Sequence, residues 1–299
     1  MSIKTKFLAT TTSLALLFSV PAFADQRNID VDTQASIKLA ESFYQDVLVY
    51  RNLDNFSKYV GDVYTQHATA YGDGPEQMLA AVTHELNADP GVQVDLYRTI
   101  AEGPYVAIQS VWTASSGEEH VYVDIWRREN GVLMEHWDHF QQVPEESANK
   151  NTMYQGPGTD IYTANQDVER NRERAIAVLN SFENPADTSA VTDYVSAEEY
   201  IQHNPNVPDG RDALIGYLDS IAQSNTRLEV EIAKTIAMGD MVLVHSKQTN
   251  LDTEDDLGFG YMDIFRFNDE GQIVEHWDIE EAQTGESAND NDVFGYSDN

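Results

Sequence analysis

The chain has 299 residues, with 51 acidic against 18 basic side chains, a formal net charge of −33 and no cysteine. A nucleic-acid backbone or an anionic lipid surface would repel such a chain, so the charge argues against nucleic acid as a partner. The lack of cysteine excludes disulfide-stapled folds, thiolate catalysis and cysteine-ligated metals. Stability must therefore come from buried apolar surface, which a chain of this length can supply.

The first 24 residues have the composition of a secretory signal peptide. Lys4 and Lys6 precede an apolar stretch, and Pro21-Ala22-Phe23-Ala24 supplies the small residues that a signal peptidase requires. The apolar stretch is too short to cross a bilayer of about 30 Å. We therefore expect residues 1–24 to be removed as a signal peptide. The mature protein is expected to be periplasmic or secreted, and not membrane-embedded.

The rest of the chain repeats itself once. Glu135 to Asn151 reads EHWDHFQQVPEESANKN, and Glu275 to Asn291 reads EHWDIEEAQTGESANDN, so that EHWD, ESAN and the final Asn coincide without a gap. Repeats of this length are whole domains, since solenoid units span only about 20 to 50 residues. We predict a first domain at 25–155, a linker at 156–164 and a second domain at 165–299.

Each half shows the same order of predicted elements. Apolar residues recur at helical spacing in two segments of each half, residues 32–47 and 76–86 in the first and 171–182 and 212–223 in the second. The period then changes to two, which is typical of strands, at residues 92–96 and 228–232. Asn130-Gly131 and Glu270-Gly271 predict the hairpins that lead into the two EHWD segments. Helices followed by a meander of strands predict two tandem α+β domains, each with helices packed on a curved antiparallel sheet.

The EHWD segments carry the first candidate chemistry. Alternate side chains of a strand face opposite sides, so His136 shares a face with Asp138, and His276 with Asp278. Apolar flanking residues place each Asp near buried surface, where the pKa of a carboxyl group rises. A further His in each half, His67 or His203, follows a Tyr-x-Gln pattern in a loop. A His-x-Asp pair is equally compatible with a structural strand, in which the two side chains satisfy each other.

Metal binding is an alternative use of these side chains. His136, Asp138 and His67, with His139 adjacent, form the set of a two-His-one-carboxylate site. However, Ile279 stands where the second half would need a counterpart of His139, and no His-Glu-x-x-His motif occurs. We therefore expect no metal. Gly-x-Ser-x-Gly and glycine-rich phosphate loops are also missing, so we expect neither a nucleophilic serine nor a nucleotide cofactor.

Four segments of the second half form a pattern whose positions recur in the first half. They are Tyr200-Ile201-Gln202-His203-Asn204-Pro205 with Asp209-Gly210, Asp263-Ile264-Phe265-Arg266, Glu275-His276-Trp277-Asp278 and Glu286-Ser287-Ala288-Asn289. In this order they resemble the signature of SnoaL-like polyketide cyclases, of the nuclear-transport-factor-2-like superfamily, in two tandem copies. The resemblance implies cone-shaped domains, in which helices and a curved sheet enclose a pocket.

The resemblance also implies a chemistry. Such cyclases close rings by aldol condensation without a metal or cofactor, and use an Asp as general acid and base. The match gives this role to Asp278 in the second half and Asp138 in the first. The histidines of the pattern would orient the Asp or donate to the developing enolate, namely His276, His203, His136 and His67. The first half departs from the pattern, because its loop reads His67-Ala68-Thr69-Ala70 and lacks the Asn and Pro.

Three functions remain open at this point. The first is an exported carbon-acid enzyme of the cyclase or isomerase type, which needs a mainly apolar pocket with a donor opposite the Asp. The second is a non-catalytic periplasmic module that binds a small hydrophobic or carbonyl-bearing molecule. The third is a structural pair, in which aromatic side chains fill the pockets, such as Trp112, Tyr122, Trp126, Phe265 and Tyr261. In each case we expect a monomer whose domains pair through their sheets as an intramolecular pseudo-dimer.

Overall fold

The structure, a computed structural model, describes residues 29–159 and 167–295. The first domain contains α1 (Val31–Phe43), the π-helical turn η2 (Tyr44–Val49), the 3-10 segment η3 (Leu53–Lys58) and α2 (Pro75–Ala88). Its strands are β1 (Val60–Gln66), β2 (Gln93–Glu102), β3 (Tyr105–Thr113), β4 (Glu119–Glu129) and β5 (Val132–Gln142). The helices of the second domain are α3 (Val168–Asn180), α4 (Ser189–Tyr194) and α5 (Arg211–Ser224). Its strands are β6 (Ile201–Gln202), β7 (Leu228–Met238), β8 (Met241–Asn250), β9 (Phe259–Phe267) and β10 (Ile273–Ala282).

The two domains have the same sheet topology. The strand order is β1-β5-β4-β3-β2 in one sheet and β6-β10-β9-β8-β7 in the other. The last four strands of each domain form the predicted antiparallel meander, and the first strand pairs in parallel with the last. Because an α+β domain with a five-stranded sheet occurs twice, the predicted fold class is confirmed. The parallel edge strand was not predicted.

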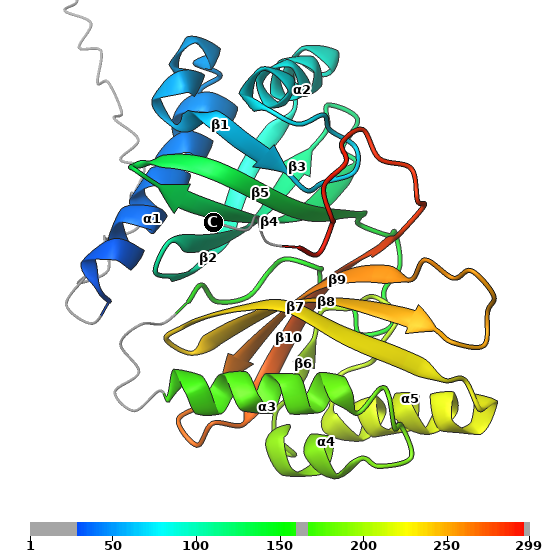
Figure 1. Ribbon diagram of the computed structural model, residues 1–299. Helices are drawn as coiled ribbons and strands as arrows, with labels where there is room; N and C mark the ends of the chain where they lie inside the picture. Colours follow the sequence, from blue (N-terminus) through cyan, green and yellow to red (C-terminus); the bar gives the residue numbers. More distant parts are fainter. Residues whose placement is uncertain (1–28, 160–166, 296–299) are drawn as a thin grey trace, which may run out of the picture.

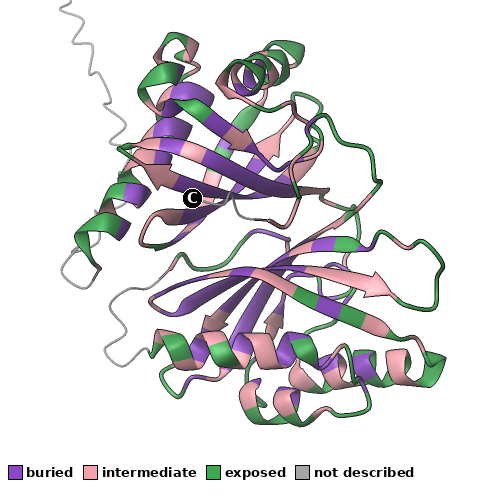
Figure 2. Cartoon of the chain, in the orientation of Figure 1, coloured by how far each residue is buried: buried purple, intermediate pink, exposed green. Residues whose placement is uncertain are grey.

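The helices cover the outer faces of the sheets, and the sheets face each other across the middle of the molecule (Figure 1). Contacts between the domains run from β5 to β10 and from β2 to β7. Buried residues accordingly lie on the facing sides of the sheets as well as beneath the helices (Figure 2). Each sheet therefore has one face towards its own helices and another towards the partner domain.

The Asp-Gly pairs of the repeat shape the loop that follows the first strand of each domain. Gly74 and Gly210 have φ values of 92° and 96°, a region that favours glycine, and α2 and α5 begin directly after them. Asp73 Oδ1 accepts the backbone N–H of Gln66, and Asp209 Oδ1 accepts that of Gln202, each at 2.8 Å. Each loop is thereby folded back onto the strand from which it started.

The described helices are all too short or too polar to span a membrane, within residues 29–159 and 167–295. The predicted signal peptide at residues 1–24 and most of the predicted linker lie outside the described residues. Both stay predictions.

Candidate functional site

Strand register assembles one Asp-His-Asp cluster in each domain. In β4 and β5, Asp124 lies directly opposite Asp138, and in β9 and β10, Asp263 lies opposite Asp278. Directly opposite residues of an antiparallel pair share a face, on which the EHWD histidine also lies. Ligand atoms of the three side chains lie within 4.8 Å of one another in both domains. The sequence correctly placed His136 with Asp138 and His276 with Asp278, but it missed Asp124 and Asp263.

His276 is held by a hydrogen-bond acceptor on each side. Nε2 lies 3.0 Å from Asp263 Oδ1, and Nδ1 lies 3.0 Å from Gln202 Oε1. Gln202 Oε1 also accepts the backbone N–H groups of the next two residues, so Nδ1 must donate to it. Burial lowers the pKa of His276, but the hydrogen bond to Asp263 and the charges of Asp278 and Asp263 together raise it above its usual value. Nδ1 therefore carries a proton, and the hydrogen bond to Asp263 places a second proton between Nε2 and Asp263 Oδ1.

Asp278 has the properties of a weakly basic carboxylate. Burial raises its pKa to about 6, opposed by the charge of His276, reinforced by the charge of Asp263 and opposed by a hydrogen bond from Asn204. Asn204 Nδ2 donates to Asp278 Oδ2 at 2.7 Å. Within the described residues, Asp278 Oδ1 receives no hydrogen bond although it is buried. One oxygen is thus held in place, while the other is available to take a proton.

A cavity of about 340 Å³ adjoins the second cluster and is lined by Asp278, His276, Asp263 and Asn204 together with apolar and aromatic side chains. Its volume falls within the range of pockets that bind small molecules. Tyr217 and Phe259 also line it and are each 43% exposed, so they mark its mouth. None of the described residues that line this cavity is Lys or Arg, whereas four are Asp or Glu. An anionic ligand would therefore be repelled.

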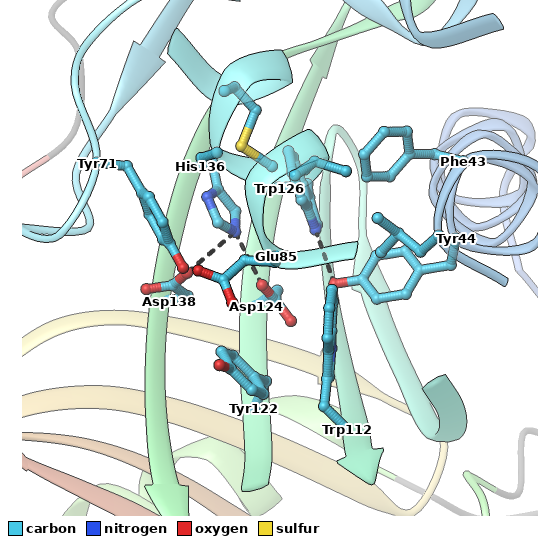
Figure 3. A pocket seen from close by; sticks show the side chains of 14 residues that line it. Phe43, Tyr44, Tyr71, Glu85, Trp112, Tyr122, Asp124, Trp126, His136 and Asp138 are labelled. Carbon is cyan, nitrogen blue, oxygen red and sulfur yellow. Dashed lines mark hydrogen bonds and ion pairs between the residues drawn. The ribbon is translucent and has the colours of Figure 1, made fainter. Parts of the chain in front are cut away.

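The corresponding space in the first domain is small. Its cavity is about 50 Å³, comparable with one or two water molecules. Figure 3 shows the rings of Tyr71, Trp112, Tyr122 and Trp126 gathered around the cluster, with the hydroxyl of Tyr71 directed towards Asp138. The expectation that aromatic side chains fill a pocket therefore applies to the first domain and not to the second.

Two replacements account for part of this difference. Trp112 of β3 pairs with His120, four residues before Asp124. Gln248 of β8 pairs with Phe259, four residues before Asp263, so Trp112 and Gln248 occupy equivalent positions. Tyr71 likewise precedes the Asp-Gly pair at the position where the second domain has Val207. A smaller side chain at each position opens the second pocket.

Asp138 also has a raised pKa. Burial raises its pKa to about 7, opposed by the charge of His136 and reinforced by the charges of Asp124 and Glu281. His136 Nε2 lies 2.9 Å from Asp124 Oδ1 and 3.9 Å from Asp138 Oδ2. Ala68 stands at the position of Asn204 and has no side-chain amide to donate. The first domain thus keeps the cluster, but its cavity is small and it has no counterpart of the hydrogen bond from Asn204 to Asp278.

The loop histidines lie on the other face of the sheet, which corrects the expectation that they join the pocket. His67 Nε2 is 2.9 Å from Glu135 Oε1, and its ring stacks on Trp137 at 4.5 Å. His203 is 2.9 Å from Glu275, and its ring stacks on the tryptophan of β10. Parallel pairing of β1 with β5 and of β6 with β10 directs these rings towards Glu and Trp of EHWD. They therefore belong to the interface between the domains.

The structure changes the set of residues that could bind a metal ion. His139 also faces the other domain, where it approaches His245 at 3.2 Å and Glu281 at 2.8 Å. The only described groups whose side chains could together bind a metal ion are the two Asp-His-Asp clusters. In the second cluster, the proton between His276 Nε2 and Asp263 Oδ1 would have to leave before a metal could bind there. The donor set suits a divalent metal, but the raised pKa of His276 opposes it.

Tyr200 is a further candidate that sequence reasoning did not assign. It lines the large cavity, is only 5% exposed, and accepts a 3.3 Å hydrogen bond from Gln202 Nε2. Because the amide nitrogen is the donor there, the hydroxyl hydrogen of Tyr200 can be donated elsewhere. Burial raises the pKa of Tyr200 further above its usual value, so the hydroxyl stays protonated. The only signal in the sequence was its place in the Tyr-x-Gln-His pattern.

A comparison with protein-family models identifies part of the second domain. Residues 174–276 match the family model of the SnoaL-like domain, so the chain contains a SnoaL-like domain there. The match does not extend to the first domain, whose relation to the second rests on the repeat and the shared topology. A search of curated proteins found no match.

Several solved structures are similar to single domains of the chain. A candidate ketosteroid isomerase from Kribbella flavida has a TM-score of 0.34 and 21% identity, over 40% of this chain and 87% of its own. A protein of unknown function from Mesorhizobium loti, described as NTF2-like, has a TM-score of 0.35 and 15% identity, over 38% and 96%. A candidate SnoaL-like polyketide cyclase from Jannaschia has a TM-score of 0.34 and 13% identity, over 38% and 91%.

Proposed function

We propose that the second domain binds a small, uncharged, mainly apolar carbonyl compound and removes a proton from the carbon next to the carbonyl group. Asp278 is the general base, and the resulting enolate continues to an aldol-type ring closure or an isomerisation. The observation that carries this proposal is the unpartnered Oδ1 of Asp278 beside a cavity of about 340 Å³. The expected class of ligand follows from the lining, since acidic side chains disfavour an anion.

The energetics require help beyond the carboxylate. Activated carbon acids have pKa values of roughly 10 to 13, and Asp278 has a pKa of about 6. Proton transfer is therefore uphill by roughly 4 to 7 units, or about 5 to 10 kcal/mol. A donor aimed at the enolate oxygen supplies stabilisation of this kind. We assign this donor to Tyr200, whose hydroxyl hydrogen is not used by Gln202. His276, fixed by Asp263, supplies positive charge beside Asp278.

The experiment is deuterium exchange from D₂O into a panel of β-keto esters, 1,3-diketones and polycyclic ketones, followed by NMR. We expect at least one compound to exchange faster than in buffer, and expect Tyr200→Phe to slow that exchange by about 10²- to 10³-fold. EDTA should leave the rate unchanged, because the proposed reaction uses Asp278 and Tyr200 and needs no metal. If no compound exchanges but several raise the melting temperature, the second domain is a binding module instead.

We also propose that the protein is exported, on the basis of residues 1–24 alone. Intact mass measurement of the protein secreted from its host, or released from the periplasm, tests this. The expected mature N-terminus is Asp25.

A further inference from the structure

Each domain extends a segment across to the other domain after its last strand. Residues 143–159, the first crossing segment, contact the loop after β6, and residues 283–295, the second crossing segment, contact the loop after β1. The second crossing segment is the red part of the chain that runs from the lower sheet to the upper domain in Figure 1. The ESAN motif of the repeat lies in both segments, so its two copies are parts of the interface.

Asn149 is the central residue of the first crossing segment. Its Nδ2 donates to the backbone oxygens of Asn204 at 2.7 Å and Val207 at 2.9 Å, and the residue is only 9% exposed. Asn204 in turn donates its side-chain amide to Asp278 Oδ2 at 2.7 Å. Two hydrogen bonds thus connect a residue of the first domain with the carboxyl group of the second pocket.

Other contacts hold the same wall of the pocket. Asn151 Nδ2 donates to the backbone oxygen of Gln202 at 3.0 Å and to Asp209 Oδ1 at 2.9 Å. Gln202 and Asn204 both line the cavity, and Gln202 is the acceptor for His276. The first crossing segment therefore contacts the backbone of Gln202, the last residue of β6, and of Asn204 in the loop that follows. The side chains of these two residues orient the second cluster.

The segment is also seated on the EHWD strand of the second domain. Trp277 Nε1 donates to the oxygen of Gln155 at 2.8 Å, and the Arg98 guanidinium lies 3.7 Å above the same ring. Gly156 has a φ of 118°, and a Cβ there would come within 2.8 Å of Arg98, Glu275 and Trp277. Only glycine lets the chain approach this closely, which fixes the path of the segment.

We propose that the first domain is a positioning element of the second pocket, in which Asn149 holds Asn204 in place to hydrogen-bond Asp278. The equivalent contact of the second crossing segment shows why this positioning is confined to the second pocket. Asn289 Nδ2 donates to the backbone oxygens of Ala68 and Tyr71, each at 2.8 Å, but Ala68 has no side-chain amide that could reach Asp138. The inference rests on the proposed function for the chemical role of Asp278, whereas the positioning itself needs no reaction.

Carboxyl titration of Asp278, measured by NMR on full-length protein with ¹³C-labelled Asp side chains, tests this proposal without a substrate. Asp278→Asn identifies the resonance. Asn149→Ala should raise the pKa of Asp278, as Asn204→Ala should. In Asn149→Ala the loop is released, and the hydrogen bond from Asn204 to Asp278 is lost. Asn289→Ala is the matched control, since it breaks the equivalent contact on the first domain. It should lower the melting temperature by a similar amount and leave the Asp278 titration unchanged.

Asn149→Ser provides a second variant if Asn149→Ala does not fold, because its hydroxyl can still donate to one of the two oxygens. It should give a smaller rise in the same direction. An unchanged Asp278 titration in a folded Asn149 variant would overturn the proposal, and so would an equal shift in Asn289→Ala. Failure of the carbon-acid reaction alone would overturn the proposed function and leave this positioning intact.

Discussion

Asn204 donates a 2.7 Å hydrogen bond to Asp278, whereas Ala68 stands at the equivalent position beside Asp138. This single difference accompanies a larger one, since the cavity is about 340 Å³ in the second domain and about 50 Å³ in the first. The two domains therefore share a cluster of the same residue types but differ in what surrounds it. The differences favour chemistry in the second domain.

The hydrogen bond from Asn204 should lower the pH at which the second pocket becomes active. The base must be ionised, so exchange should rise as pH increases through about 6, the pKa of Asp278. In Asn204→Ala the charged form loses a donor, and the midpoint should move to higher pH. Exchange rates measured from pH 4 to 9 test this. A midpoint that stays the same or falls would contradict it.

Asp138 should destabilise the fold when it ionises. Its pKa is raised from 3.8 to about 7 in the folded protein, so the folded state holds the proton more tightly than the unfolded chain. Stability is lost as pH rises from about 4 to 7, by about 1.4 kcal/mol for each unit of the shift. Asp138→Asn should therefore raise the melting temperature at pH 8 by at least about 4 °C and have little effect at pH 4. Equal effects at both pH values would exclude this explanation.

Filling the second pocket should abolish ligand binding without unfolding the domain. Gln248→Trp introduces the side chain that the first domain carries at the equivalent position, Trp112. The measurement is the rise in melting temperature caused by a carbonyl compound that stabilises the unmodified protein. We expect this rise to disappear in Gln248→Trp. Trp112→Gln serves as the control and should leave the rise intact, because it changes only the other domain.

His67 should contribute to stability and not to catalysis. Its ring pairs with buried Glu135 and stacks on Trp137, away from both cavities. His67→Ala should lower the free energy of unfolding by about 1–3 kcal/mol, since a buried acceptor loses one donor while Arg127 still pairs with it. Urea denaturation measures this loss. If the exchange rate falls at least tenfold in folded His67→Ala, His67 contributes to catalysis and the prediction is wrong.

The repeat and the strand period allowed much of the fold to be predicted. The alternation of side chains along a strand alone predicted that His136 and Asp138 share a face of the sheet, because residues two places apart point to the same side. The opposite carboxylates, Asp124 and Asp263, depend on cross-strand register, which contains a bulge in both domains. A local pattern does not fix where such a bulge falls.

The orientation of the loop histidines and the crossing of Asn149 could not be predicted for a related reason. Both depend on contacts between segments far apart in the sequence. His203 turns away from the pocket because β6 pairs in parallel with β10, and the ESAN motif reads locally as a polar loop. Only the packing of one domain on the other reveals that this loop supports a pocket.

Deuterium exchange into the best compound of the panel, measured side by side for Asp278→Asn and Asp138→Asn at pH 8, tests most directly whether the reaction belongs to the second domain. We predict that Asp278→Asn reduces exchange at least about 10²-fold, to near the buffer rate, because the general base is lost. Asp138→Asn should retain the full rate. Loss of exchange in Asp138→Asn, or retention in Asp278→Asn, would contradict the assignment of the reaction to the second domain.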